Sequence, residues 1–538
     1  MAEKIVADLK RVSSSSGLYA VANMLQRGLS FILLPVYTRF LDVAEYGILD
    51  TLSGLSAILF GVLLLGMPSA LTKVYHRDCK TPEDQKSLLF TALMLDLPPL
   101  ILGAGTLCIF AEPLGFWLFG EEGRADVVRL AVITVVFSSL VAIVLSSFRT
   151  RERAVSYAML NFMQFGVGML LNIGLVVWFR MGVHGVLWGN LISSIAALPV
   201  GLMMAKSDIR WKFEERMVRP LLHFGVLVIP SAITGWVITM ADRYVLRYYF
   251  SLEDVAIYGV GYKIGMIMQM GLVWPFQLAW PAVAFSISKR KVHRRTFARV
   301  LTYLSFAMGI GVLGLSLCSQ AGLDEFAGPS YANSHAVVPW VALAYAFAGV
   351  QFCLSPGIHI AGKTRYLPLF SAVAAFVNLG LNLYWVPKYG MLGATWATTA
   401  SYFVLALMTV LLSQKVYWLP LETGRLVRIV VIAGGVYALG AFVPLWSGLV
   451  EELTWSLFLA CVAFPALMLG SGFLRPGERK VIAELYNKYT PWTIPVPEVD
   501  PGGDLDMSGS DIPMPDLSLL KPPAGVSDDG DEPDSESK

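Results

Sequence analysis

The chain of 538 residues is 56% hydrophobic and only 15% charged, with 48 glycines in addition to the hydrophobic count. Soluble globular proteins contain about 45–50% apolar residues, glycine included, and about 25% charged residues, so this composition excludes a water-soluble protein. Basic and acidic residues number 41 and 39, for a net charge of +2, which offers no concentrated basic surface for nucleic acid.

Long apolar runs predict an all-α integral membrane protein. A bilayer core about 30 Å thick takes about 20 residues of helix, whereas barrel strands give shorter, alternating segments. Charged residues divide this chain into about fourteen such runs. The predicted helices cover residues 15–37, 47–71, 88–110, 126–147, 155–178, 184–205, 220–240, 254–286, 300–318, 336–360, 366–386, 391–413, 426–446 and 454–474. Pro275 and Pro281 predict a kink in the 254–286 helix.

The basic residues alternate between the two sides of the predicted membrane. Cytoplasmic loops hold more Lys and Arg than outer loops, and most basic residues lie in even-numbered connections, including Arg149–Arg153, Lys206–Arg219 and Lys289–Arg299. The residues on the other side are Arg39, Arg124, Arg129, Arg180, Arg243, Arg247 and Lys388. This pattern predicts two cytoplasmic termini and an even number of helices, because one missed helix would invert every later loop.

The two ends of the chain differ in character. The first apolar run contains Arg27 and precedes no small-residue cleavage site, so it is predicted to remain as a span. Residues 475–490 fit a short surface helix, and residues 498–538, rich in Asp, Gly, Pro and Ser, are predicted to be disordered. This acidic tail either recruits a partner or is solvated without a role. A metal-dependent glycosyltransferase would need the DxD pair of Asp504 and Asp506 on a folded domain instead.

Three short motifs recur in the same order. The pairs are DVAxYG at 42–47 and 254–259, Asn-x-Gly-Leu at 172–175 and 378–381, and GxxGxxW at 182–188 and 390–396. Each copy spans six helices and begins on the same side of the membrane. Repeats of this kind are parallel and related by an axis along the membrane normal, so two six-helix lobes are predicted.

The repeat sets the predicted domain boundaries. The lobes cover residues 14–205 and 220–413, and a cytoplasmic linker joins them at 206–219. A cytoplasmic N-terminus (1–13), two extra helices (414–474) and a largely disordered cytoplasmic tail (475–538) complete the chain.

Several segments resemble the polysaccharide transporters, or Wzx-type O-antigen flippases, of the multidrug/oligosaccharidyl-lipid/polysaccharide exporter superfamily. They are Pro35–Leu41 with Glu45–Gly47, Ala241–Tyr244 with Ile257–Val260, and Asn378–Gly393. The resemblance implies two lobes in a V shape around a cavity that opens alternately to each side. It implies a multi-pass protein of the bacterial inner membrane that flips a polyprenyl-pyrophosphate-linked oligosaccharide to the outer leaflet for O-antigen, capsule or exopolysaccharide synthesis. Membrane lipid, and a polysaccharide polymerase or other assembly proteins, are the expected partners.

Arg27 is the first candidate for binding the pyrophosphate. A charge inside a bilayer costs several kcal/mol unless it is paired or hydrated, so it suggests a function. Arg27 lies about ten residues, or roughly 15 Å, into its helix, and a guanidinium binds phosphate oxygens in bidentate fashion. An ion pair with Asp96 is the alternative role.

Lys263 is the candidate in the second lobe, with Arg243 of the Ala241–Tyr244 segment beside it as a further cavity cation. Lys263 lies between Gly261 and Gly265, a spacing that permits close helix approach. Its alternative role is an ion pair with Asp242 or Asp254. No strand precedes these glycines, so they do not form a nucleotide-binding loop.

Asp96, Asp50 and Asp242 are candidates for binding a coupling H⁺ or Na⁺, since intramembrane carboxylates often serve ion relays. Asp96 precedes Pro98 and Pro99, which would free backbone carbonyls beside it. Pairing with Arg27 is its alternative role. Asp50 and Asp242 are predicted near the outer surface, as solvated or helix-capping carboxylates.

Trp274 and Trp280 are candidates for contact with sugar or lipid, although aromatic residues near an interface usually serve as anchors. The sequence predicts no enzyme, no cofactor, no metal site and no ATP-driven step. Its six histidines are dispersed, its five cysteines form no CxxC pair, and no Walker motif is present.

Two other functions are also consistent with the sequence. One is a cation-coupled drug exporter of the same superfamily, which would prefer an acidic cavity and twelve helices. The other is a non-transporting scaffold for polysaccharide assembly that acts through the acidic tail.

Overall fold

The computed structural model describes residues 31–288, 293–442, 448–475, 477–479, 484 and 487. Every regular element in these residues is a helix, and twelve helical segments are long and apolar enough to cross a membrane. The described residues up to Leu467 belong to one compact unit, and those from Met468 onward belong to a second. The first unit contains all the candidate site residues that the structure describes.

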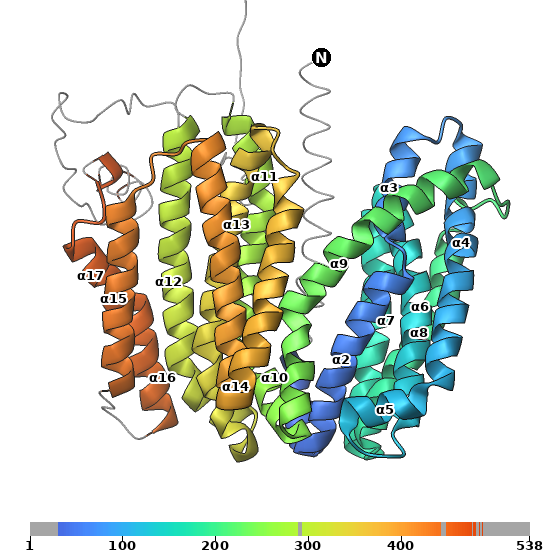
Figure 1. Cartoon of the computed structure of the whole chain (residues 1–538), viewed down its shortest axis with the longest axis horizontal. Helices are drawn as coiled ribbons and strands as arrows, with labels where there is room; N and C mark the ends of the chain where they lie inside the picture. Colours follow the sequence, from blue (N-terminus) through green and yellow to red (C-terminus); the bar gives the residue numbers. More distant parts are fainter. Residues whose placement is uncertain are drawn as a thin grey trace, which may run out of the picture. The chain divides into compact units, whose positions relative to one another are not determined.

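The helices follow one another through the first unit as in Figure 1. Their bounds are α2 (Val43–Leu63), α3 (Met67–Arg77), α4 (Pro82–Ile109), α5 (Ala111–Phe119), α6 (Ala125–Thr150), α7 (Ala154–Ile173), α8 (Gly182–Met204), α9 (Glu215–Tyr249), α10 (Leu252–Gly265), α11 (Trp274–Ile287), α12 (His293–Phe326), α13 (Val338–Ile360), α14 (Tyr366–Val416), α15 (Thr423–Phe442), α16 (Leu449–Phe458) and α17 (Phe464–Gly470). Shorter turns are η1 (Gly174–Trp178), η2 (Gln269–Val273), η3 (Pro329–Val337) and η4 (Leu459–Ala463).

The predicted all-α membrane architecture is confirmed. Each predicted span from 47–71 onward overlaps a helix of the structure. The first span is described only from residue 31, where Phe31–Phe40 is an apolar helix. The number fourteen stays a prediction, as do the domain boundaries and the sidedness of the loops. Residues 215–219 of the predicted linker form the first turn of α9.

The predicted 254–286 span is one candidate span with a π-helical turn before its prolines, and the kink stays a prediction. Leu252–Ile287 forms a single candidate span, in which the π-helical turn η2 lies directly before Pro275. Proline has no N–H to donate and its ring clashes with the preceding turn, so the helix widens at this point. The capping box of Ser251 and Asp254 fixes where α10 begins.

α14 is a helical hairpin. Its 51 residues would extend about 77 Å as one straight helix, well beyond a bilayer core of about 30 Å. Gly390 interrupts it with φ 56° and ψ −132°. The ring centroids of Trp385 and Trp396 lie 6.4 Å apart, whereas a straight helix would separate these residues by about 16 Å along its axis. The two arms correspond to the predicted spans 366–386 and 391–413.

The GxxGxxW motif forms the same turn in both halves of the chain. Gly182, the counterpart of Gly390, has φ +58°, a conformation that glycine adopts without steric cost. A Cβ added at Gly185 would lie 3.1 Å from the Leu175 backbone, and one added at Gly393 would lie 2.5 Å from the Trp385 carbonyl oxygen. The second glycine of each motif is therefore required where two helices cross closely.

Buried hydrophobic residues form separate clusters in the two halves. One cluster lies within residues 64–221, and another within residues 238–419. A smaller cluster combines both halves, with Tyr37 and Tyr46 packed near Ala256 and Val260. This shared cluster surrounds the crossing of α2 and α10.

The crossing of α2 and α10 brings the two DVAxYG motifs together. A Cβ added at Gly47 would clash with the Leu252 carbonyl, and one added at Gly259 would lie 2.6 Å from the Asp50 carboxylate. α9 joins them, since Trp236 donates a hydrogen bond to the Gly54 carbonyl at 2.7 Å. Three helices from the two halves thus meet around Asp50.

Candidate functional site

Four charged side chains meet where α2, α9 and α10 converge. This ion cluster consists of Asp50 from α2, Asp242 and Arg243 from α9, and Lys263 from α10. Two carboxylates face two cations, so the cluster is formally neutral. Neutrality matters here because an isolated charge inside a membrane protein is costly, whereas a paired and hydrogen-bonded one is tolerated.

Arg243 is the centre of the cluster. Its Nε donates to Oδ2 of Asp50 at 2.6 Å, and its Nη1 lies 3.0 Å from Oδ1 of Asp242. The same nitrogen donates to the Thr239 carbonyl at 2.9 Å. The guanidinium carbon lies 4.5 Å from the ring centroid of Tyr262, within range of a cation–π contact. Arg243 is only 2% exposed, so its partners replace water entirely.

Asp242 accepts hydrogen bonds from three different helices. Its Oδ1 accepts from the backbone N–H of Arg243 at 2.9 Å. Its Oδ2 accepts from the hydroxyl of Tyr258 on α10 and from the hydroxyl of Thr398 on α14, the latter at 3.3 Å. These bonds hold a fully buried carboxylate in place and link α9 to α10 and α14.

Lys263 is the accessible member of the cluster. Its Nζ lies 3.6 Å from Oδ1 of Asp50, a longer ion pair than those of Arg243, and its side chain is 34% exposed. It donates to the hydroxyl of Tyr46 at 2.7 Å and lies 4.7 Å from the centroid of that ring. Lys263 can therefore reach a ligand without dismantling the buried pairs around Arg243.

Three expectations about these charges were wrong. Asp50 and Asp242 are not solvated, since their exposed fractions are 2% and 0%. They face inward at a helix crossing, where Arg243 pairs with both and Lys263 pairs with Asp50. Lys263 pairs with Asp50 rather than with Asp242 or Asp254, because Asp254 accepts from the Ser251 backbone and hydroxyl at the start of α10. The DVAxYG repeat predicted that α2 and α10 are equivalent, but not that they touch.

Asp96 lies apart from the ion cluster, on α4. Its side chain is 0% exposed, and neither carboxylate oxygen has a hydrogen-bond partner among the described residues. Pro98 and Pro99 continue the same helix. A buried acid without a hydrogen-bond partner among the described residues is a candidate site for a proton or a cation. Arg27 lies outside the described residues, and its roles stay predictions.

The candidate aromatic residues have different environments. Trp280 is a core residue, since it is 4% exposed and its Nε1 donates to the Cys353 carbonyl at 2.8 Å. Its ring packs against Phe297 at 5.0 Å between centroids. Trp274 begins α11 and is partly buried. Because the Nε1–H of Trp280 already bonds the Cys353 carbonyl, this residue is better suited to packing in the core than to contact with sugar.

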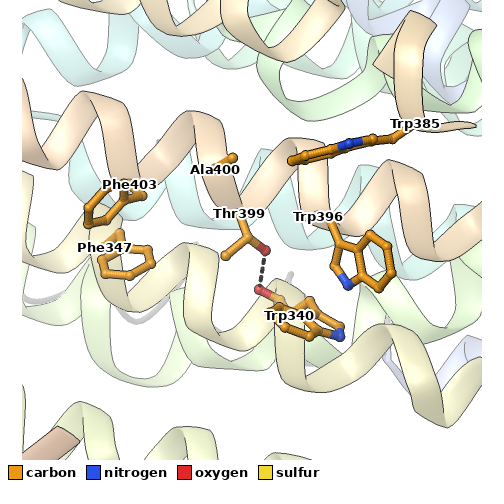
Figure 2. Close-up of a pocket in the computed structure, with 7 residues that line it drawn as sticks. All are labelled: Trp340, Phe347, Trp385, Trp396, Thr399, Ala400 and Phe403. Atoms are coloured by element: carbon orange, nitrogen blue, oxygen red, sulfur yellow. Dashed lines mark hydrogen bonds between the residues drawn. The ribbon is translucent and has the colours of Figure 1, made fainter. Parts of the chain in front are cut away.

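Other tryptophans form the apolar groove shown in Figure 2. It has a volume of about 340 Å³, and its lining residues on α13 and α14 are Trp340, Phe347, Trp385, Trp396, Thr399, Ala400 and Phe403. The hydroxyl of Thr399 donates to the Trp340 carbonyl at 2.9 Å, which joins the two helices beneath the rings. Sequence reasoning missed this groove, although Trp396 closes the second GxxGxxW motif.

The described residues contain no group of three or more His, Cys, Asp or Glu side chains arranged to hold a metal ion. All five cysteines are free thiols.

Comparison with known proteins identifies the family to which this chain belongs. Residues 13–285 match the model of the family described as polysaccharide biosynthesis protein. The chain belongs to this family. The resemblance to polysaccharide transporters seen in the sequence is thereby confirmed. Among curated relatives, the protein is 19% identical over 391 residues to a probable low-salt glycan biosynthesis flippase, Agl15, of Haloferax volcanii, covering 71% of this chain and 79% of that protein.

Solved structures show the same fold. The lipid II flippase MurJ in an inward closed conformation superposes with a TM-score of 0.68 at 14% identity, covering 85% of this chain and all of MurJ. An inward-facing multidrug resistance transporter of the MATE family, in the MOP superfamily, gives a TM-score of 0.57 at 13% identity, covering 73% of this chain and 97% of the transporter. The family member described here has the fold of these transporters.

Proposed function

We propose that this protein is a flippase that moves a polyprenyl-pyrophosphate-linked oligosaccharide from the cytoplasmic to the outer leaflet of a bacterial inner membrane, for surface polysaccharide synthesis. Membership of the polysaccharide biosynthesis protein family and the transporter fold support the class of function. The Haloferax relative, named as a glycan biosynthesis flippase, supports a glycan as the cargo.

The ion cluster carries the mechanistic part of the proposal. Asp50 lies about 10 Å from the start of α2, toward the end of the helices predicted to face outward. Its pair with Arg243 closes the contact between helices that come from different halves of the chain. We propose that this contact closes the outer side in the conformation described, and that it separates when the cavity opens outward.

Lys263 couples the substrate to this contact. A pyrophosphate that approached its exposed ammonium would compete with Asp50, because phosphate oxygens are strong acceptors for a cation. Asp50 would then keep Arg243 as its only cationic partner among the described residues, and the contact between α2 and α10 would weaken. Arg27 is the proposed pyrophosphate ligand of the first lobe. Arg243 is assigned to the closing contact, because both carboxylates already occupy it.

Asp96 is the proposed site of a coupling proton. Its unpartnered carboxylate would release the proton only when water or a cation reached α4, which ties protonation to conformation. A Na⁺ ion at the same carboxylate is the other coupling ion that the proposal allows. The two are distinguished by whether transport follows the pH gradient or the Na⁺ gradient.

A complementation experiment tests the function. A strain lacking the protein receives wild-type protein, Lys263→Gln or Arg27→Ala, and inner-leaflet lipid-linked oligosaccharide and surface polysaccharide are measured. We expect the inner-leaflet intermediate to accumulate in the deletion strain, and wild type alone to restore surface polymer. Normal surface polymer in the deletion strain would rule out the flippase.

A drug exporter is the second candidate, favoured by the likeness to MATE transporters. It predicts greater sensitivity of the deletion strain to cationic drugs with intact surface polymer. A scaffold for polymerases or other assembly proteins predicts instead that removal of residues 495–538 abolishes surface polymer, whereas a flippase largely survives this truncation.

A further inference from the structure

A basic cavity lies at the end of the helices that is predicted to face the cytoplasm. It is an open surface pocket of about 690 Å³, at which His76, Arg77 and Arg149 are exposed. Its lining residues, from α3, α6 and α9, are Ser69, Thr72, Lys73, His76, Arg77, Arg149 and Phe224. Four of the seven side chains are basic and none is acidic, so the cavity selects for an anion.

Among the described residues, the cations of this cavity form no ion pair with an acidic side chain, whereas neighbouring cations do. At the same end of the helices, Arg153 pairs with Asp208, Arg210 with Glu83, and Arg216 with Asp84. Lys212 pairs with Glu214 at 2.8 Å and thereby lowers the pKa of that carboxyl. Among the described residues, no carboxylate forms an ion pair with Lys73, His76, Arg77 or Arg149. The described ion pairs of this region therefore lie around the loops, outside the cavity.

The geometry of α3 gathers these charges. Lys73, His76 and Arg77 are three and four positions apart, and such residues share one face of a helix. α3 follows its N-cap Gly66, which has a φ of +62°. α3 packs against α6, where the hydroxyls of Thr72 and Thr150 lie 2.8 Å apart. That contact places Arg149, the neighbour of Thr150, beside the α3 face.

Lys73 is held in position rather than extended into solvent. Its Nζ lies 3.9 Å from the ring centroid of Phe224 on α9, a cation–π contact that leaves the ammonium donors free for a ligand. The hydroxyl of Ser69 adds a further donor at the rim. Cations near helix C-termini also interact with the helix dipole, but that effect does not require them to line one cavity.

We propose that this cavity binds the diphosphate of the lipid-linked glycan on the loading side of the membrane, before the substrate reaches Arg27 and Lys263. The inference rests on the proposed function. Phosphate esters reach this surface from two sources, the substrate and the anionic phospholipids of the membrane. The arginines supply bidentate donors for phosphate oxygens, and Lys73 supplies a point charge.

A binding experiment tests the site. Radiolabelled farnesyl pyrophosphate is titrated onto the full-length protein in phosphatidylcholine nanodiscs. The triple variant Lys73→Gln/Arg77→Gln/Arg149→Gln is compared with the control Lys206→Gln/Arg210→Gln/Lys212→Gln, which removes the same charge from a nearby loop. We expect at least a tenfold weaker affinity for the cavity variant and less than a twofold change for the control. An equal loss of affinity in both variants would show that binding depends only on the overall positive charge, and would overturn the site.

Competition distinguishes the two sources of phosphate. In nanodiscs that contain phosphatidylglycerol, the affinity for farnesyl pyrophosphate should stay within threefold of that in phosphatidylcholine nanodiscs. A loss of tenfold or more would assign the cavity to membrane phospholipid and overturn the substrate assignment. Lys73→Arg/Arg77→Lys/Arg149→Lys, which keeps the charge, should bind within threefold of wild type. A cavity variant that elutes and melts as wild type but binds equally well would also overturn the proposal.

The failure of this site differs from the failure of the proposed function. If the deletion strain accumulates inner-leaflet intermediate but the cavity variant binds farnesyl pyrophosphate as wild type does, only the site is wrong. If the cavity variant loses binding but the deletion strain has normal surface polymer, the cavity recognises diphosphate and the flippase assignment is wrong.

Discussion

The carboxylate of Asp50 and the guanidinium of Arg243, which are 193 positions apart in the chain, form a buried ion pair of 2.6 Å. The pair connects α2 to α9, and Lys263 extends it to α10. It is a point at which the two predicted halves meet through charge, within the apolar cluster that both halves share. Its members differ in burial and in partners, so their substitutions are expected to have different effects.

The buried pair is expected to be sensitive to the loss of either partner. Arg243→Ala and Asp50→Ala should each reduce stability by about 3–5 kcal/mol, because one charge is left buried without its partner. The double variant should lose less than the sum of the two. Thermal unfolding in detergent measures these effects in a double-mutant cycle. Arg124→Ala, which breaks an exposed pair with Glu121 of 3.3 Å, is the control and should cost about 0–1 kcal/mol. Strict additivity would show that the pair contributes nothing.

Lys263 is expected to matter more for transport than for folding. Lys263→Gln removes a half-buried cation and its 3.6 Å contact with Asp50, but leaves both short pairs of Arg243 in place. Its melting temperature should fall less than that of Arg243→Gln, while surface polymer in the complementation assay is lost. Lys388→Gln, at an exposed position, is the matched control. Normal transport by Lys263→Gln would remove this residue from the substrate path.

Gly259 is expected to tolerate no side chain. A Cβ at this position would lie 2.6 Å from Oδ2 of Asp50, within α10 and against α2. Gly259→Ala should therefore lower the melting temperature and displace the ion cluster. Gly380→Ala adds the same methyl group where nothing lies within 4 Å, and should be neutral or stabilise by up to about 1 kcal/mol. Equal melting temperatures for the two variants would contradict the close crossing.

Asp96→Asn tests whether a proton on this carboxylate drives transport. Asparagine mimics the protonated acid in size and polarity, so the variant should fold with an unchanged melting temperature. Transport in vesicles should no longer respond to an imposed pH gradient. Asp126→Asn, an exposed position beside His184, should keep the response. If transport by the Asp96→Asn protein still responds to the pH gradient, the coupling proton binds at another residue.

Cys79 offers a pH-dependent probe of the loop between α3 and α4. Burial, with Asp84 and Asp78 nearby, raises the pKa of this thiol to about 11, and only the thiolate reacts with alkylating reagents. The labelling rate should therefore be low at pH 7 and rise about tenfold per pH unit toward pH 11. A Ser207→Cys protein without the native cysteines serves as the control and should react much faster at pH 7. Equal rates at pH 7 would contradict the burial of Cys79.

The composition of the sequence indicates that lipid surrounds most of this protein, and its apolar runs locate the helices. Lipid imposes about 20 apolar residues on each span and forbids unpaired backbone groups, so the runs of apolar residues locate the helices. The GxxGxxW motif predicted only the repeat, and the structure adds that Gly182 and Gly390 both adopt positive φ. The helical spans depend on residues that are close together in the sequence, so the sequence alone is enough to predict them.

The partners of the intramembrane charges depended on the tertiary structure. Sequence reasoning singled out Asp50, Asp242, Arg243 and Lys263 because charge is costly in lipid, but it placed both aspartates in solvent. Their pairing depends on how α2, α9 and α10 cross, and the distance along the chain carries no information about that crossing. The same holds for the basic cavity of α3 and α6, because Lys73 and Arg149 become neighbours only when two helices pack together.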